Sequence, residues 1–289
     1  MPTSHLIRLL CTLCVCVVLA PAASADERYQ TTRGLGLGGQ LTAGSGAPAL
    51  FHNPAALMAA PGYHVDAGYL YQERQQTHST GFTVVDMQTN PNLAGGLSYQ
   101  MNFGGNTPSL GGVSEQDARV GLAAPLFTNR LAIGFGGRWV RQVQGNRSEE
   151  IPRSQVGGIT LDLGGFALLS RNVAIAAAAQ NLRRIEGLTH RTVSSGIGLY
   201  FPMLFASLEW QLHLLSPTQQ RHNTGGALEG RFGPFSVRSA VQLSGADDAT
   251  YVSAGFGWRE HEGGFDVGFR IDARDTGNRQ FGASLTLLY

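Results

Sequence analysis

Apolar and polar side chains alternate along much of the chain. The alternation is clearest over residues 204–214, where every even-numbered position is apolar and the odd-numbered positions from 207 to 213 are polar. A period of two residues predicts a β-strand with one apolar and one polar face. A helix would scatter Glu209 and His213 among the leucines. The stretch is also long enough to cross a membrane as a tilted strand, which takes about 9–11 residues.

Similar segments follow one another through the rest of the chain, with turn residues between them. They predict an all-β protein built as a transmembrane antiparallel β-barrel of about 14 strands, or about 12 if 80–85 and one neighbour are not strands. The predicted strands cover residues 63–71, 80–85, 93–103, 118–124, 131–139, 159–163, 173–179, 193–201, 204–214, 226–232, 235–243, 252–258, 265–271 and 281–289.

The predicted connections between these strands fall into two alternating classes. Short connections are expected at 128–129, 170–172, 201–203 and 233–234, and longer, polar ones at 104–116, 145–155, 181–192 and 215–223. Outer-membrane barrels have short periplasmic turns and longer external loops. The alternation therefore favours a membrane barrel over a soluble secreted β-sandwich, which is the alternative interpretation of the same strands.

Residues 1–25 are predicted to be a secretory signal peptide. His5 and Arg8 precede an apolar run over residues 9–20, and Ala23-Ser24-Ala25 forms a small-x-small cleavage site. The run is shorter than the roughly 20 residues that a membrane-spanning helix needs. All three cysteines of the chain lie in this segment. The mature chain is therefore expected to have no disulfide, no thiolate metal site and no cysteine nucleophile.

The composition narrows the class further. The chain has no lysine, and its 21 Arg face 20 Asp and Glu, so cleavage that removes Arg8 leaves a mature net charge of zero. Such a chain has no basic footprint for nucleic acid. Charged residues make up only 14%, Gly is abundant at 39 residues, and no apolar run after the signal reaches the length of a transmembrane helix. An exported chain of this kind is typical of a barrel that crosses the membrane with alternating strands.

Residues 33–57 interrupt the alternation with the Gly- and Ala-rich sequence RGLGLGGQLTAGSGAPALFHNPAAL. The stretch is too flexible for an ordinary helix or strand. It nevertheless holds apolar side chains, Leu50, Phe51 and Leu57 among them, that a solvated linker would not need. We therefore expect another part of the protein to cover it.

The same stretch contains a match to the dinucleotide-binding spacing G-x-G-x-x-G, at Gly34, Gly36 and Gly39. That fingerprint has meaning only between a buried strand and the start of a helix. Here the preceding DERYQTT is polar, and Pro48 and Pro54 oppose a helix downstream. We interpret the match as accidental.

The run from Gly38-Gly39 to Asn53-Pro54-Ala55 resembles the N-terminal plug of the long-chain fatty-acid transporter family of outer-membrane β-barrels. It also resembles the related shuttle barrels of the type IX secretion system. The resemblance implies a plug over residues 26–62 and a barrel over residues 63–289. It places Leu50, Phe51, Asn53, Pro54 and Leu57 in the plug or near a substrate, with Asn53-Pro54-Ala55 at the joint to the first strand.

The last predicted strand, Phe281 to Tyr289, alternates apolar residues and ends on an aromatic. It resembles the C-terminal signal by which the barrel assembly machinery recognises outer-membrane barrels. A terminal Phe is the commoner form, so Tyr289 is a small departure from that signal.

The polar faces of the predicted strands would line the lumen. Both charge signs occur there in similar number, which favours either an arginine and carboxylate lattice that braces the wall or a polar permeation path. The candidates are His64, Asp66, Gln100, Arg119, Arg138, Asp162, Glu209, His213, Glu229, Arg231, Arg238, Asp266, Arg270 and Asp272.

No catalytic or metal-binding motif stands out. Glu209 and His213 are four residues apart on one strand, roughly 13 Å, so they cannot touch. There is no Ser-based elbow, zincin helix or metal-spaced His pair. A phospholipase-like or deacylase-like site assembled from several strands is the one enzymatic alternative that the sequence would hide. We expect no cofactor and no metal.

By the resemblance, the expected function is passive uptake of hydrophobic or amphipathic small molecules across the outer membrane of a Gram-negative bacterium, after Sec-dependent export. The alternative is a barrel that does not transport and instead serves as a secretion, surface-attachment or structural partner.

Overall fold

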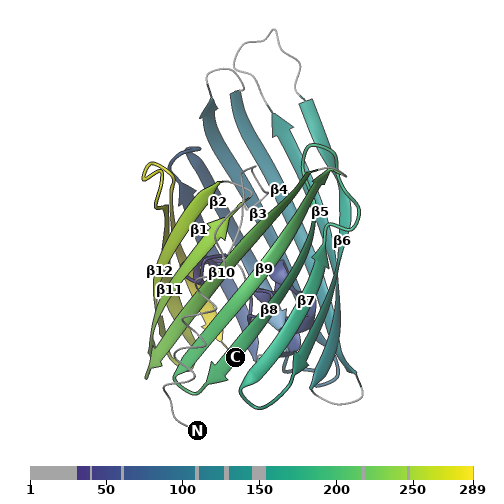
Figure 1. The fold of residues 1–289 in the computed structure, drawn as a ribbon, viewed down its shortest axis with the longest axis vertical. Coiled ribbons are helices and arrows are strands. Elements are labelled where there is room, and N and C mark those ends of the chain that lie inside the picture. Colours follow the sequence, from purple (N-terminus) through teal and green to yellow (C-terminus); the bar gives the residue numbers. More distant parts are fainter. Residues whose placement is uncertain are drawn as a thin grey trace.

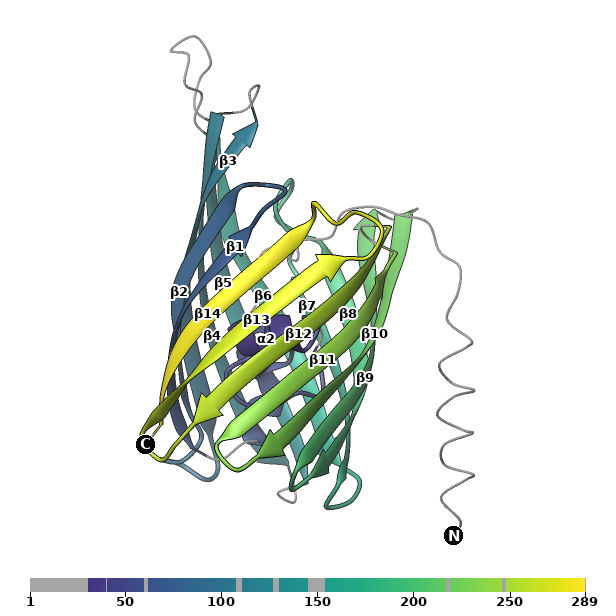
Figure 2. The same cartoon turned by 90° about the vertical axis from the view of Figure 1, so that its left-hand side faces the viewer.

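The strands of the computed structural model close into a single barrel (Figures 1 and 2). The structure describes residues 31–288 with gaps at 40, 60–61, 108–110, 127–129, 145–153, 217–218 and 246–247. The predicted signal peptide and Tyr289 lie outside the described residues. Every strand pairs antiparallel with its sequence neighbours, and β1 closes the barrel on β14, with Ala67 opposite Leu285.

All fourteen predicted strands are present, so the predicted fold class and strand number are confirmed. The strands are β1 (Tyr63–Gln72), β2 (Thr77–Asp86), β3 (Ala94–Thr107), β4 (Gly111–Leu126), β5 (Leu131–Gln144), β6 (Ser154–Leu168), β7 (Val173–Gln180), β8 (Arg191–Phe201), β9 (Leu204–Ser216), β10 (Gln219–Phe232), β11 (Phe235–Ser244), β12 (Ala249–Arg259), β13 (Gly263–Asp272) and β14 (Arg279–Leu288).

The two faces of the wall differ in polarity, as the alternation predicts. Large apolar side chains such as Phe135, Ile159 and Leu285 are more than half exposed on the outer surface. Buried polar side chains such as Gln100 and Asp162 face inward. A surface with this polarity needs apolar surroundings, which is the defining property of a transmembrane barrel.

We call the end of the barrel that holds the start of β1 and the end of β14 the near end, and the opposite end the far end. The four predicted short connections all lie at the near end. Two predicted long connections, 104–116 and 215–223, are wrong, because β3 and β4 leave only residues 108–110 between them and β9 and β10 leave only 217–218. Strands extend through polar sequence there, because the ladder continues beyond the apolar band of the wall.

Helices contribute little to the fold. The described ones are α2 (Thr32–Gly36), α3 (Ala49–His52) and the 3₁₀ helix η1 (Pro54–Ala59). The prediction that residues 33–57 contain no helix is therefore wrong in detail, and Pro54 begins a helical turn, where its missing N–H costs nothing. No helix in the described part of the chain is long and apolar enough to cross a membrane.

Candidate functional site

The described residues 31–39 and 41–59, here called the lumenal segment, lie inside the barrel (Figure 2). Helix α2 contacts β11 to β14 and β1, whereas α3 and η1 contact β3 to β6. The segment therefore reaches from one side of the wall to the other. Almost all of its residues are buried, and its leucine and phenylalanine side chains are at most 4% exposed.

Arg33 attaches the start of the segment to the wall. The Thr31 hydroxyl accepts from the Gly34 amide and caps α2, which orients the next turn. The Arg33 guanidinium donates from Nε to Glu229 Oε2 at 2.8 Å and from Nη1 to the Ser45 carbonyl at 2.8 Å. Burial alone would lower the pKa of Arg33, but the Glu229 carboxylate outweighs burial and raises it, so the ion pair persists.

Glu229 is also the centre of a lattice of ion pairs on the wall. It accepts from Arg231 Nε at 2.7 Å and from Arg238 Nε at 2.9 Å. Arg238 donates to Asp266 as well, and Asp266 accepts from Arg259 at 3.2 Å. These charges line a cavity of about 380 Å³ on the near-end side of the segment, together with Ala47, Pro48, His64 and Pro234.

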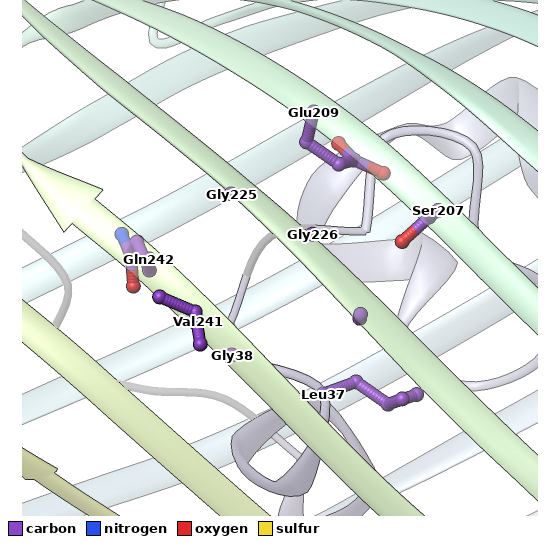
Figure 3. A pocket seen from close by; sticks show the side chains of 9 residues that line it. Leu37, Gly38, Ser207, Glu209, Gly225, Gly226, Val241 and Gln242 are labelled. Carbon is purple, nitrogen blue, oxygen red and sulfur yellow. The ribbon is translucent and has the colours of Figure 1, made fainter. Parts of the chain in front are cut away.

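A second wall carboxylate, Glu209 on β9, binds the middle of the segment. Its two oxygens accept from the backbone amides of Thr42 at 2.7 Å and Ala43 at 3.2 Å. Glu209 also lines a small cavity together with Leu37, Gly38, Ser207 and Gln242 (Figure 3). The cavity holds about 10 Å³, near the least that accommodates one water molecule.

Asn53 attaches the end of the segment to β6 and is fully buried. Its amide nitrogen donates to the carbonyls of Thr42 at 2.9 Å and Gly165 at 3.1 Å, and its Oδ1 accepts from the Ala55 amide at 3.1 Å. One side chain thus joins two turns of the segment to each other and to the wall.

Two inward-facing glycines make room for this attachment. A Cβ atom at Gly164 would lie less than 3.0 Å from Asn53 Oδ1, and one at Gly134 would collide with the backbone of Pro54 and Ala55. Real Cβ atoms essentially never approach other atoms so closely. The two glycines therefore let the chain from Asn53 to Ala55 lie directly against the wall.

The apolar side chains of the segment form a cluster against small side chains of the wall. Leu50, Phe51 and Leu57 pack with alanines and with Val85 and Phe166. A second cluster joins Leu37 and Leu41 to Phe205, Ala227 and Ala240. Because these clusters consist largely of methyl groups, this part of the contact is apolar. Besides the three attachment points described above, the Phe51 carbonyl accepts from Arg119 and Gln180, and the Ala43 carbonyl accepts from the Tyr200 hydroxyl.

Four more lumen candidates, Arg119, Arg138, Asp162 and Arg270, lie in two further groups. Arg119 donates to Asp117 at 3.2 Å and to the Phe51 carbonyl at 3.3 Å, and its guanidinium lies over the Phe51 ring. Arg138 also binds Asp117, at 2.7 Å, while Asp162 accepts from the Asn181 amide. On the opposite side, Arg270 lies over the Tyr251 ring and donates to Gln242.

His213 belongs to a row of polar side chains across four strands. Asn223 accepts from the Ser244 hydroxyl through Oδ1, so its amide nitrogen faces His213 Nε2 at 3.0 Å. The other ring nitrogen, Nδ1, faces Thr192 Oγ1 at 3.2 Å. The imidazole thus links β8 to β10 inside the lumen.

Sequence reasoning missed the partners of the lumenal segment. Arg33 and Glu229 are 196 residues apart, and nothing local in either stretch links them. The glycines at inward positions of β5, β6 and β13, namely Gly134, Gly164 and Gly268, were the available signal, because each faces the segment and could not carry a Cβ.

The fold is that of known hydrophobic-compound transporters. The chain superposes on the Ralstonia pickettii toluene transporter TbuX with a TM-score of 0.64 and 14% identity, over 91% of this chain and 98% of that one. The monoaromatic hydrocarbon channel CymD superposes with a TM-score of 0.69 and 11% identity, over 92% of this chain and 98% of that one. A Pseudomonas aeruginosa FadL homologue superposes with a TM-score of 0.65 and 11% identity, over 92% of this chain and 99% of that one. No protein-family model and no curated protein sequence matches the chain.

Proposed function

We propose that the protein is an outer-membrane channel for passive uptake of hydrophobic or amphipathic small molecules, and that the lumenal segment closes its route. The single observation that carries the proposal is the segment itself. It lies across the lumen, presents Leu50, Phe51 and Leu57 in an apolar cluster, and bonds to the wall at Glu229, Glu209 and Gly165. The likeness to barrels described as toluene and hydrocarbon transporters supports the same class of solute.

The chemistry of this closure suits a segment that shifts. Its contacts with the wall are mainly methyl groups, which lose little when another apolar molecule replaces them. A hydrophobic solute could therefore compete for the apolar surface, while the polar attachments return the segment to its place. A polar solute gains nothing from the same surface, so the closure selects for hydrophobicity.

Asn53→Ala tests this proposal. The substitution removes three hydrogen bonds that position the apolar side chains of the segment, at a cost of about 1–3 kcal/mol where a buried partner is left unsatisfied. In a strain that lacks the protein and takes up hydrophobic solutes slowly, the wild-type chain should restore uptake, and Asn53→Ala should raise uptake above the wild-type level, because a segment that is held less firmly closes the route less often.

Two comparisons make the result interpretable. Asn90→Ala, at an exposed turn outside the segment, should restore uptake as well as the wild type. Equal uptake with and without the wild-type chain, together with loss of proteins from the cell surface, would contradict transport and favour the non-transporting partner role.

A further inference from the structure

At the far end of the barrel, β7 ends well before its neighbour β6, and this drop in the height of the wall is here called the β7 step. Strand β6 pairs with β7 only from Leu163 to Leu168. Beyond this point one ladder bond remains, in which the Leu182 amide donates to the Leu161 carbonyl at 2.9 Å. The connection 181–190 folds over the step, and Ile185 and Leu188 pack inward on Val140. Several other residues of this connection, Arg183 and Arg184 among them, are exposed at the surface next to β6.

Arginines gather at this step. Arg183 and Arg184 are exposed on the connection, and Arg191 follows at the start of β8. Arg191 Nε donates to the Leu182 carbonyl at 3.1 Å, which fixes its side chain over the step. Arg141 lies on the outer face of β5, opposite Gly157 of β6. Among the residues that the structure describes, none of these four has a carboxylate within ion-pair distance. The connection also carries one exposed carboxylate, Glu186, so the step keeps an excess of positive charge.

Three other arginines at the far end of the barrel each pair with a carboxylate. Arg74 pairs with Asp275 at 3.2 Å, Arg274 with Asp248 at 2.8 Å, and Arg279 with Glu73 at 3.2 Å. These pairs neutralise the rim on the side of β1, β2 and β11 to β14. The positive charge at the β7 step is thus a local property and not a general feature of the rim.

Exposed aliphatic side chains lie next to the arginines. Ile159 and Leu161 on β6 are 56% and 55% exposed, and Leu182 and Val193 are 43% and 40% exposed. Between them, β7 presents only alanines outward at this level, since Ala179 lies opposite Leu163 and Val193. A cationic cluster directly above an apolar surface fits a ligand with anionic groups at one end and hydrocarbon chains at the other.

We propose that the β7 step binds a phosphorylated glycolipid of the outer leaflet, of the lipid A type. Arginine guanidinium groups bind phosphate oxygens in pairs of hydrogen bonds, and clustered arginines at a membrane surface attract anionic headgroups. The phosphates would lie among Arg141, Arg183, Arg184 and Arg191, and the acyl chains along Ile159, Leu161 and Val193. The far end carries the two longest connections, which is the external side in outer-membrane barrels. The inference rests on the proposed outer-membrane placement but not on transport.

Binding can be measured on the purified mature chain in detergent, by native mass spectrometry with bisphosphorylated lipid A as the probe. The triple variant Arg183→Gln, Arg184→Gln and Arg191→Gln should bind lipid A at least about tenfold more weakly than the wild type. The matched control, Arg74→Gln, Arg274→Gln and Arg279→Gln, makes the same change in charge on the other side of the rim. It should stay within about twofold of the wild type.

Two further measurements test whether the phosphates and the arginines account for the binding. Lipid A without its phosphates should bind the wild type as weakly as bisphosphorylated lipid A binds the triple variant. The double variant Arg183→Gln and Arg184→Gln keeps the Arg191 bond to Leu182, so it should lose affinity while the barrel still shows heat-modifiable migration. Equal losses in the triple variant and the control would overturn the proposal. So would equal affinity for lipid A with and without its phosphates, or affinity for inorganic phosphate as high as that for lipid A. None of these readouts depends on solute uptake.

Discussion

Gly164→Ala is expected to push the lumenal segment away from the wall while the barrel itself still folds. The new Cβ would lie less than 3.0 Å from Asn53 Oδ1, and the Ala55 amide is 3.1 Å from the same position. Overpacking of this kind costs about 1–3 kcal/mol. Because about 1.4 kcal/mol is a tenfold change in an equilibrium, the displaced population should rise about fivefold or more.

Ion conductance in planar bilayers measures that displacement, since a lumen without the segment exposes its polar lining to water. The variant should show frequent open events, and the wild type few. Gly165→Ala is the matched control, because position 165 faces outward and its nearest neighbour would be the Ala177 carbonyl at 4.0 Å. Conductance equal to the wild type in Gly164→Ala, in a barrel that folds, would show that the segment does not close the lumen.

Glu229→Gln should cost more stability than any other single change in the lumen. Glu229 accepts from Arg33, Arg231 and Arg238, and its side chain is 3% exposed. Loss of the carboxylate leaves the buried guanidinium of Arg33 without its counter-charge, whereas Arg238 keeps Asp266. Breaking a buried pair in this way costs about 3–5 kcal/mol. Urea unfolding of the barrel in lipid vesicles measures the difference.

The control for this prediction is Arg33→Gln, which removes one of the three partners and leaves Glu229 paired with two arginines on the wall. We expect a smaller loss of stability than in Glu229→Gln, together with a rise in conductance, because Arg33 is the partner that belongs to the lumenal segment. If Glu229→Gln unfolds at the same urea concentration as the wild type, the lattice does not brace the barrel.

The strands were predictable because one physical cause sets their pattern. A wall with lipid outside and polar side chains inside must alternate, and even the weakest candidate, residues 80–85, is part of β2. The same cause explains the errors at 104–116 and 215–223. Beyond the apolar band a strand no longer needs apolar residues on its outer face, so the alternation ends before the hydrogen-bonded ladder does.

The inward side of the wall was predictable by position but not by partner. Glu209 and Arg238 were both expected in the lumen. Their partners, the Thr42 amide and Glu229, come close to them only when the fourteen strands close into a barrel. The resemblance of residues 38–55 to a plug gave a place for the segment. It could not give Arg33 as an attachment point, because an arginine beside glycines carries no local sign of a carboxylate 196 residues away.

The most direct test of the account locks the lumenal segment to the wall and measures uptake. A Cβ at Gly198 would lie 3.4 Å from Ala43 Cβ, close to disulfide geometry once the Tyr200 ring, 2.9 Å from that Cβ, shifts aside. The three natural cysteines all lie in residues 11–16, within the predicted signal peptide. Cells that carry Ala43→Cys with Gly198→Cys are assayed with N-phenylnaphthylamine, a hydrophobic dye that fluoresces in phospholipid. Uptake should fall to the level of cells without the protein when the disulfide is formed and recover on reduction. Uptake that is the same in both states would contradict a route closed by the segment.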